Sequence, residues 1–205
     1  FVNSFLMTAI INIPKIRIDY VIEQGRMESG MQTVFNILFM PASVLTLIYI
    51  VFRPLLTKMA IEWNAGRKKG FLKIVGMIFI CLLGISIIVL GGSAWLGIPI
   101  LSILYGLDLS KYRMELLIMI TGGCLCTFSY VFDNALIVIR RQYLLLFSYV
   151  LSWIYIEIVI GKMVDKWGVL GAAFAYSTSM MVFLIVTFLI FIICLRKDGK
   201  ELKEQ

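Results

Sequence analysis

The chain has 205 residues, of which 61% are hydrophobic and 15% charged, and its mean hydropathy is +0.97. Soluble domains carry about 25% charged residues, so this composition excludes a soluble domain and predicts an integral membrane protein. The net charge of +7 lies at the ends of apolar runs without interleaved exposed aromatics, which excludes a nucleic-acid partner. Those cations are instead expected to attract anionic membrane lipids.

The sequence offers little for metal binding or catalysis. Histidine is absent, and the four cysteines lie within apolar runs. Cys124 and Cys126 would point roughly 200° apart on a helix, so they would not bind one metal ion together. There is no G-x-S-x-G, no phosphate-binding G-x-x-x-x-G-K-[ST] and no aspartate pair spaced for a divalent metal. We therefore expect no metal site, no cofactor and no enzymatic activity.

The chain opens with Phe1 inside an apolar stretch, with no basic leader and no small-residue cleavage site. We therefore expect no signal peptide, and we expect a fragment whose first span is truncated at its start. Many transporters consist of two similar halves with the binding site between them. An N-terminal lobe of the same protein is thus the expected missing partner.

Apolar runs long enough to cross a hydrocarbon core of about 30 Å recur along the chain, separated by short charged or glycine-bearing connections. The predicted fold is all-α: a polytopic membrane bundle of about six antiparallel helices within residues 1–195, forming one lobe of a two-lobed transporter. A cytoplasmic tail follows at residues 196–205. The expected spans are residues 1–20, 33–52, 71–95, 116–138, 143–160 and 169–195.

The connections between spans also carry information. Residues 25–30 form a polar turn, and the second span is expected to end at Arg53 and Pro54. Residues 55–70 combine several cations with a tryptophan, which predicts a short amphipathic helix on the membrane surface. Residues 98–105 are too short to cross and are expected to extend the third span at the interface.

Basic residues are distributed unevenly between the two sides of the predicted topology. The connections after the second and fourth spans, together with the tail, carry 12 lysines and arginines, whereas the opposite side carries five. Because positive charge accumulates on the cytoplasmic side, the C-terminus is predicted to lie in the cytoplasm.

The first span contains a proline and a stripe of polar residues. Pro14 removes the backbone hydrogen bond to Ile10, which predicts a kink or hinge. At 100° per residue, one stripe roughly 100° wide collects the polar side chains, which indicates a cavity beside this helix. The members of the stripe are Ser4, Thr8, Asn12, Lys15, Asp19 and Glu23.

Two interpretations of the charges in this span remain open. Lys15 and Asp19, spaced i and i+4, either face a ligand or neutralise one another inside the bundle. Arg17 lies roughly 200° from Lys15 on a straight helix. Either the kink at Pro14 rotates Arg17 toward the same cavity, or its side chain reaches a lipid headgroup.

Two further acids lie within predicted spans, and buried acids in membranes are often functional. Asp133 is an ion-coupling candidate, with an interfacial pair to Arg140 as the alternative. Glu157 could be a proton or cation site, or it could pair with Lys162. We expect Glu157 to lie near the outer end of its span.

Four short motifs follow one another along the chain: Pro14, Lys15, Ile18 and Asp19; the turn with Gly25 and Gly30; Arg53, Pro54 and Leu55; and Trp167, Gly168, Gly171, Ala172 and Ala173. In this order they resemble the C-terminal half of bacterial polysaccharide biosynthesis flippases. These belong to the multidrug/oligosaccharidyl-lipid/polysaccharide exporter superfamily, and the resemblance extends over essentially the whole chain.

The resemblance implies at least twelve spans in two lobes, in a bacterial cytoplasmic membrane. The implied cargo is an undecaprenyl-pyrophosphate-linked oligosaccharide, such as a lipopolysaccharide precursor, flipped by alternating access. Polymerase or assembly proteins of the polysaccharide are possible partners. On this interpretation Lys15 and Arg17 bind the pyrophosphate, Asn12 lines the cavity, Asp19 orients Lys15 and Pro14 provides the hinge.

Two alternatives remain open. A cation-coupled multidrug or organic-cation antiporter of the same superfamily would use Asp133 or Glu157 as its coupling site. A non-transporting membrane assembly subunit would hold all its buried charges in structural pairs.

Overall fold

The computed structural model describes residues 2–201 and the side chains of residues 2–197. All regular elements in this part of the chain are helical, as predicted. The longer ones are α1 (Val2–Glu23), α2 (Met31–Ile48), α3 (Arg53–Asn64), α4 (Lys68–Gly92), α5 (Ile98–Tyr105), α6 (Arg113–Val138) and α7 (Leu145–Glu201).

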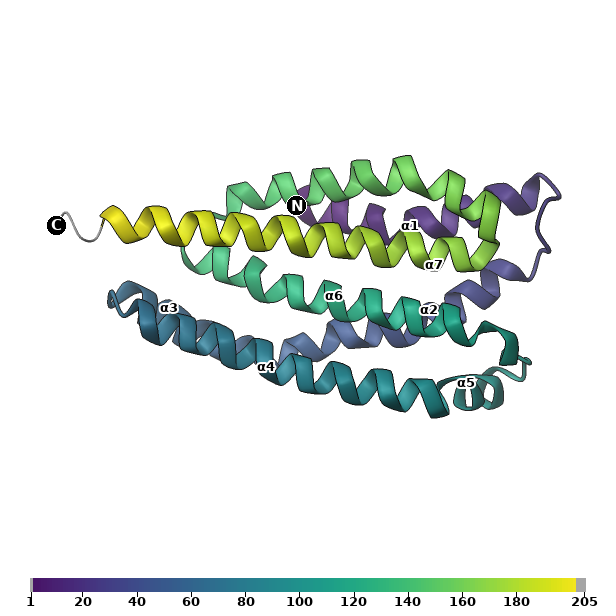
Figure 1. Ribbon diagram of the computed structural model, residues 1–205, viewed down its shortest axis with the longest axis horizontal. Coiled ribbons are helices and arrows are strands. Elements are labelled where there is room, and N and C mark those ends of the chain that lie inside the picture. The colour runs from purple at the N-terminus through teal and green to yellow at the C-terminus, as the bar shows by residue number, and fades with distance from the viewer. Residues whose placement is uncertain (1, 202–205) are drawn as a thin grey trace.

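The long helices run roughly parallel to one axis, in an elongated bundle (Figure 1). The turn from α3 to α4, the turn from α6 to α7 and the last turns of α7 lie at one end of the bundle (Figure 1). The turn from α1 to α2 and the connection from α5 to α6 lie at the other end. The connections that the sequence marks as most basic are therefore gathered at the end of the bundle where α7 ends.

The second predicted span does not stop at Arg53 and Pro54. A 3-10 turn, Tyr49–Phe52, joins α2 directly to α3, which begins at Arg53 with Pro54 in its first turn. A proline is tolerated there because the first N–H groups of a helix need no partner within it. The connection is helical, as predicted, and α3 packs against α4, where the ring of Trp63 lies 5.1 Å from that of Phe71. The place of this helix on the membrane surface stays a prediction.

The third predicted span continues past its expected end at Trp95. A π-helical turn, Ser93–Gly97, links α4 to α5, and Gly106 closes α5 in the left-handed conformation with φ 65°. The predicted extension over residues 98–105 is thus helical. The side chains of Trp95 and Ile103 are more than 80% exposed within this chain, as expected for residues that face lipid or another subunit.

The fifth and sixth predicted spans are the two arms of α7. Gly168 is their only non-helical residue, with φ 56° and ψ −129°, and the chain reverses there (Figure 1). Across the turn, the rings of Tyr149 and Phe183 lie 4.7 Å apart. The loop predicted after Ile160 is wrong, because the first arm stays helical as far as the turn. The polar residues that suggested a loop lie on exposed helical positions.

Helix α6 is the most buried of the long helices, and α2 and α7 pack on it closely. A Cβ atom on Gly123 would lie 2.7 Å from the carbonyl oxygen of Ala42 on α2. A Cβ on Gly122 would meet the ring of Tyr176 on the second arm of α7. Small residues at such crossings are typical of helix packing in membranes.

Four helical stretches of the described chain are long and apolar enough to cross a membrane. Each combines neighbouring elements, and the last includes both arms of α7. Helix α1 is not among them; it carries three charges within five residues. The stretches are Met31–Asn64, Lys68–Tyr105, Ser110–Val138 and Gln142–Lys197.

Candidate functional site

The polar stripe on α1 is present, and its N-terminal members bond to their own helix. The Thr8 hydroxyl donates to the carbonyl of Ser4 at 2.9 Å, and the Asn12 amide donates to the carbonyl of Thr8 at 2.8 Å. Asn12 retains one N–H and its side-chain oxygen for another partner. The first half of the stripe is therefore polar but uncharged, and its side chains bond mainly to the backbone of α1.

Lys15 and Asp19 each contact α2 rather than one another. The ammonium of Lys15 lies 5.1 Å from the ring centroid of Phe39, whose ring packs edge-on against Tyr176 at 5.0 Å. The Asp19 carboxylate accepts a hydrogen bond from Gln32 at 2.6 Å. Among the side chains of residues 2–197, the ion pairs within 4.0 Å do not include Lys15 or Asp19. The two charges therefore do not form the predicted pair.

Arg17 points toward α7, away from the face of Lys15. One terminal nitrogen of its guanidinium lies 2.9 Å from both carboxylate oxygens of Asp165, and the group also lies 5.0 Å from the ring of Tyr20. Arg26, in the turn after α1, reaches the same carboxylate at 3.3 Å. The structure thus separates the two cations onto different faces of α1.

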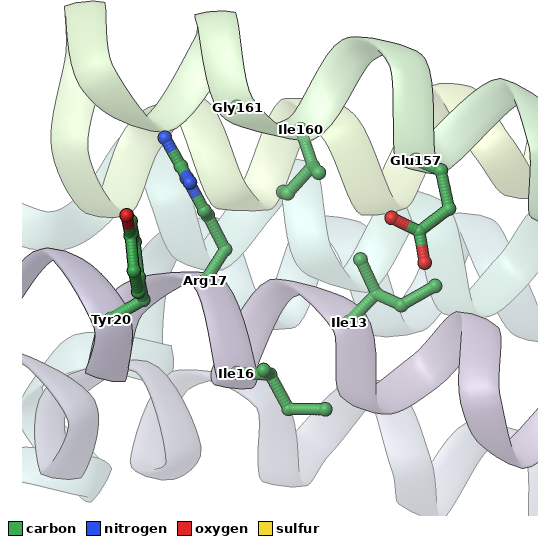
Figure 2. Close-up of a pocket in the computed structure, with 7 residues that line it drawn as sticks. All are labelled: Ile13, Ile16, Arg17, Tyr20, Glu157, Ile160 and Gly161. Carbon is green, nitrogen blue, oxygen red and sulfur yellow. The ribbon is translucent and has the colours of Figure 1, made fainter.

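A groove of about 320 Å³ lies between α1 and the first arm of α7. Figure 2 shows the side chain of Arg17 crossing from α1 to the α7 backbone beside Gly161, while Glu157 points down from α7 toward Ile13. The two polar groups thus stand at opposite ends of a largely apolar lining. The lining residues are Ile13, Ile16, Arg17, Tyr20, Glu157, Ile160 and Gly161.

Pro14 lies inside α1, which remains helical from Val2 to Glu23. Its ring nitrogen has no hydrogen to donate to the carbonyl of Ile10, one turn earlier. Both residues are buried against the bundle. The assignment of Pro14 as a hinge remains a prediction.

Asp133 is buried on α6 and is only 6% exposed. One of its carboxylate oxygens accepts a hydrogen bond from the hydroxyl of Tyr149 at 2.6 Å, while the other has no partner. The hydroxyls of Ser148 and Ser152, on the same arm of α7 as Tyr149, are also buried without a partner. Asp133 therefore pairs with a tyrosine instead of the arginine that the alternative interpretation required.

The sequence predicts Glu157 near the outer end of its span. In the structure it lies near the middle of the first arm of α7, which extends past the predicted span. Ten residues, or about 15 Å of helix, separate it from Trp167. The side chain is exposed, and among the described side chains it forms no ion pair with Lys162. The helix continues beyond Ile160, and the place of Glu157 near the outer end of the membrane span stays a prediction.

Sequence reasoning missed the partners of these charges. Asp165 falls in the connection expected between the fifth and sixth spans, Gln32 falls just before the second span and Phe39 within it, and the prediction singles out none of the three. One signal was available: Arg17 within an apolar span requires an acceptor, and Asp165 is among the few acids expected near that end of the bundle.

No group of three metal-ligating side chains occurs among the described residues. Comparison with known proteins adds no assignment: no family model, no curated protein and no solved structure matches this chain. The structure by itself therefore shows a helical bundle with several long apolar helices, which is typical of a membrane protein.

Proposed function

We propose that this chain is one lobe of a membrane transporter that flips a lipid-linked oligosaccharide carrying a pyrophosphate. The observation that carries the proposal is the environment of Lys15. Its ammonium lies on the polar stripe of α1 and contacts an aromatic ring, with no acidic partner among the described side chains. A cation held in this way is available to an anionic ligand.

The polar stripe gives this cation a suitable setting. Asn12, one turn before Lys15, keeps spare hydrogen-bonding capacity, and Asp19, one turn after it, is fixed by Gln32. A phosphate oxygen would gain a charge-assisted hydrogen bond from Lys15, which is stronger than one between neutral groups.

The proposed lobe crosses the bacterial cytoplasmic membrane six times. This count treats α1 as a span despite its charges and treats the two arms of α7 as separate spans. The basic end of the bundle, which holds the C-terminus, would face the cytoplasm. An N-terminal lobe would complete the cavity beside α1, and polysaccharide polymerase or assembly proteins would receive the flipped cargo.

The test uses the full-length protein in a cell whose surface polysaccharide depends on it. Lys15→Ala should lower surface polysaccharide at least tenfold and leave lipid-linked oligosaccharide accumulating in the inner leaflet. Lys15→Arg should retain part of the activity, because it keeps the charge. Lys162→Ala removes an exposed cation outside the stripe and serves as the control. Normal polysaccharide with Lys15→Ala at normal expression would reject the proposal.

Asp133 favours a second candidate function, a cation-coupled exporter of drugs or organic cations. A buried carboxylate with one oxygen that has no hydrogen-bond partner is suited to binding a proton or a monovalent cation. Under this alternative, Asp133→Asn abolishes drug resistance while surface polysaccharide is unchanged. Loss of polysaccharide with Lys15→Ala would decide against it.

A further inference from the structure

Arg17 and Arg26 share one carboxylate at the end of the bundle where α1 meets its turn. A terminal nitrogen of Arg17 lies 2.9 Å from each oxygen of Asp165, and a terminal nitrogen of Arg26 lies 3.3 Å from one of them. Two guanidinium groups thus converge on a single acid. The cluster carries one excess positive charge.

These guanidinium groups have donors to spare. Arginine carries five N–H groups, and Nε of Arg17 is buried with no acceptor. The second terminal nitrogen of Arg26 donates to the side chain of Gln24. The side chains of Arg17, Arg26 and Asp165 are 25%, 45% and 40% exposed, so a ligand can reach all three.

The groove continues from this cluster toward the middle of the bundle. Arg17 lies six residues, or about 9 Å, before the end of α1, and Ile13 lies one turn deeper. Ile13, Ile16 and Ile160 line the path, and Gly161 leaves room beside the guanidinium: a Cβ there would lie 3.6 Å from Arg17. The groove has positive charge near the end of the bundle and an apolar lining toward the middle. This arrangement matches an amphiphile whose headgroup is anionic.

We propose that this groove binds a membrane lipid with a phosphate headgroup, and that Asp165 is an internal counter-ion which the phosphate displaces. Arg17 and Arg26 would hold the phosphate, and the hydrocarbon chain would lie on the isoleucines. Binding of a phosphate lipid does not depend on the proposed function. The inference rests on that function only where the bound lipid is identified with the transported cargo. A phosphate is favoured over a carboxylate because a phosphate monoester has three acceptor oxygens and more than one negative charge, whereas the Asp165 carboxylate has two oxygens and one charge.

Glu157 marks the deep end of the groove, next to Ile13 (Figure 2). A glutamate carboxylate is negatively charged and donates no hydrogen bond, so it repels a phosphate. The headgroup is therefore expected at the arginine end of the groove. Glu157→Gln removes this repulsion but leaves the shape unchanged. Lipid binding at the arginines should therefore survive that substitution.

The two halves of the cluster predict effects of opposite sign. Arg17→Ala removes ligand contacts and should weaken binding of the lipid about tenfold, the loss of roughly one charge-assisted hydrogen-bonded contact. Asp165→Asn removes the competing charge and should strengthen binding at least threefold. If Asp165 served only to fasten α1 to α7, its replacement would weaken binding or leave it unchanged.

The experiment measures lipid binding to the whole solubilised protein by native mass spectrometry. Phosphatidic acid and diacylglycerol form a matched pair that differs only in the phosphate. Arg17→Ala, Arg17→Lys, Asp165→Asn and Glu157→Gln are compared with Lys162→Ala, a control that removes a cation from the same arm outside the groove. Thermal unfolding of each variant shows whether it is folded.

The proposal requires phosphatidic acid to bind more tightly than diacylglycerol, with Arg17→Ala and Asp165→Asn changing that preference in opposite directions. It is overturned if both variants are folded and bind like the original chain, or if Asp165→Asn weakens binding. Inorganic pyrophosphate has no hydrocarbon chain. If it displaces bound phosphatidic acid as effectively as the lipid itself does, the apolar groove contributes nothing to binding and its proposed role is overturned. A polyprenyl phosphate that binds no better than phosphatidic acid would leave the site standing and count against the proposed cargo.

Discussion

Replacing Gly123 with alanine tests how closely α2 and α6 must pack. The added Cβ would lie 2.7 Å from the carbonyl oxygen of Ala42 and 3.0 Å from its Cα, whereas ordinary contacts begin at 3.4 Å. The obstruction is backbone, so it cannot rotate away, and the helices must separate by several tenths of an ångström. Overpacking of this kind costs about 1–3 kcal/mol of the free energy of unfolding.

The matched control is Gly84→Ala on α4, where nothing lies within 4 Å of an added Cβ. There alanine is the better helix former, so stability should rise by up to about 1 kcal/mol. Both variants can be measured by reversible unfolding in mixed micelles. If the two substitutions have equal effects, the close approach of α2 to α6 does not exist.

Three further substitutions have outcomes that follow from single features. Tyr149→Phe removes the hydrogen bond that Tyr149 donates to the buried Asp133 and should lower the free energy of unfolding by about 1–3 kcal/mol. Gly168→Ala forces a side chain into a conformation with φ 56° and ψ −129° and should cost about 1–3 kcal/mol, seen as a lower midpoint of thermal unfolding. Pro14→Ala should return the hydrogen bond to the Ile10 carbonyl and raise the unfolding midpoint; if Pro14 is the hinge, transport measured in vesicles should slow at the same time.

The sequence was sufficient for the class of fold, because that depends on composition and on the length of the apolar runs. It also predicted the helix between α2 and α4, where cations and Trp63 are combined with apolar residues. It failed at the boundary of the first arm of α7. Lys162, Asp165 and Lys166 are compatible with an exposed helix as well as with a loop, and only packing against α1 decides between them.

The site illustrates the same limit. Helical periodicity correctly put Lys15 and Arg17 on different faces of α1, since that requires only the pitch of the helix. It could not identify what each face meets. Asp165 lies 148 residues from Arg17 in the chain, and Phe39 reaches Lys15 through the packing of another helix. Such contacts depend on tertiary arrangement, which local spacing does not encode.

The single-residue turn at Gly168 has a mechanical consequence. Two long helical arms joined without a loop have no slack, so a displacement of one arm at the turn must be followed by the other. Asp165 lies within one helical turn of that point and holds α1 through Arg17. Movement of α1 away from the bundle would therefore either break the ion pair between Arg17 and Asp165 or move both arms of α7 together.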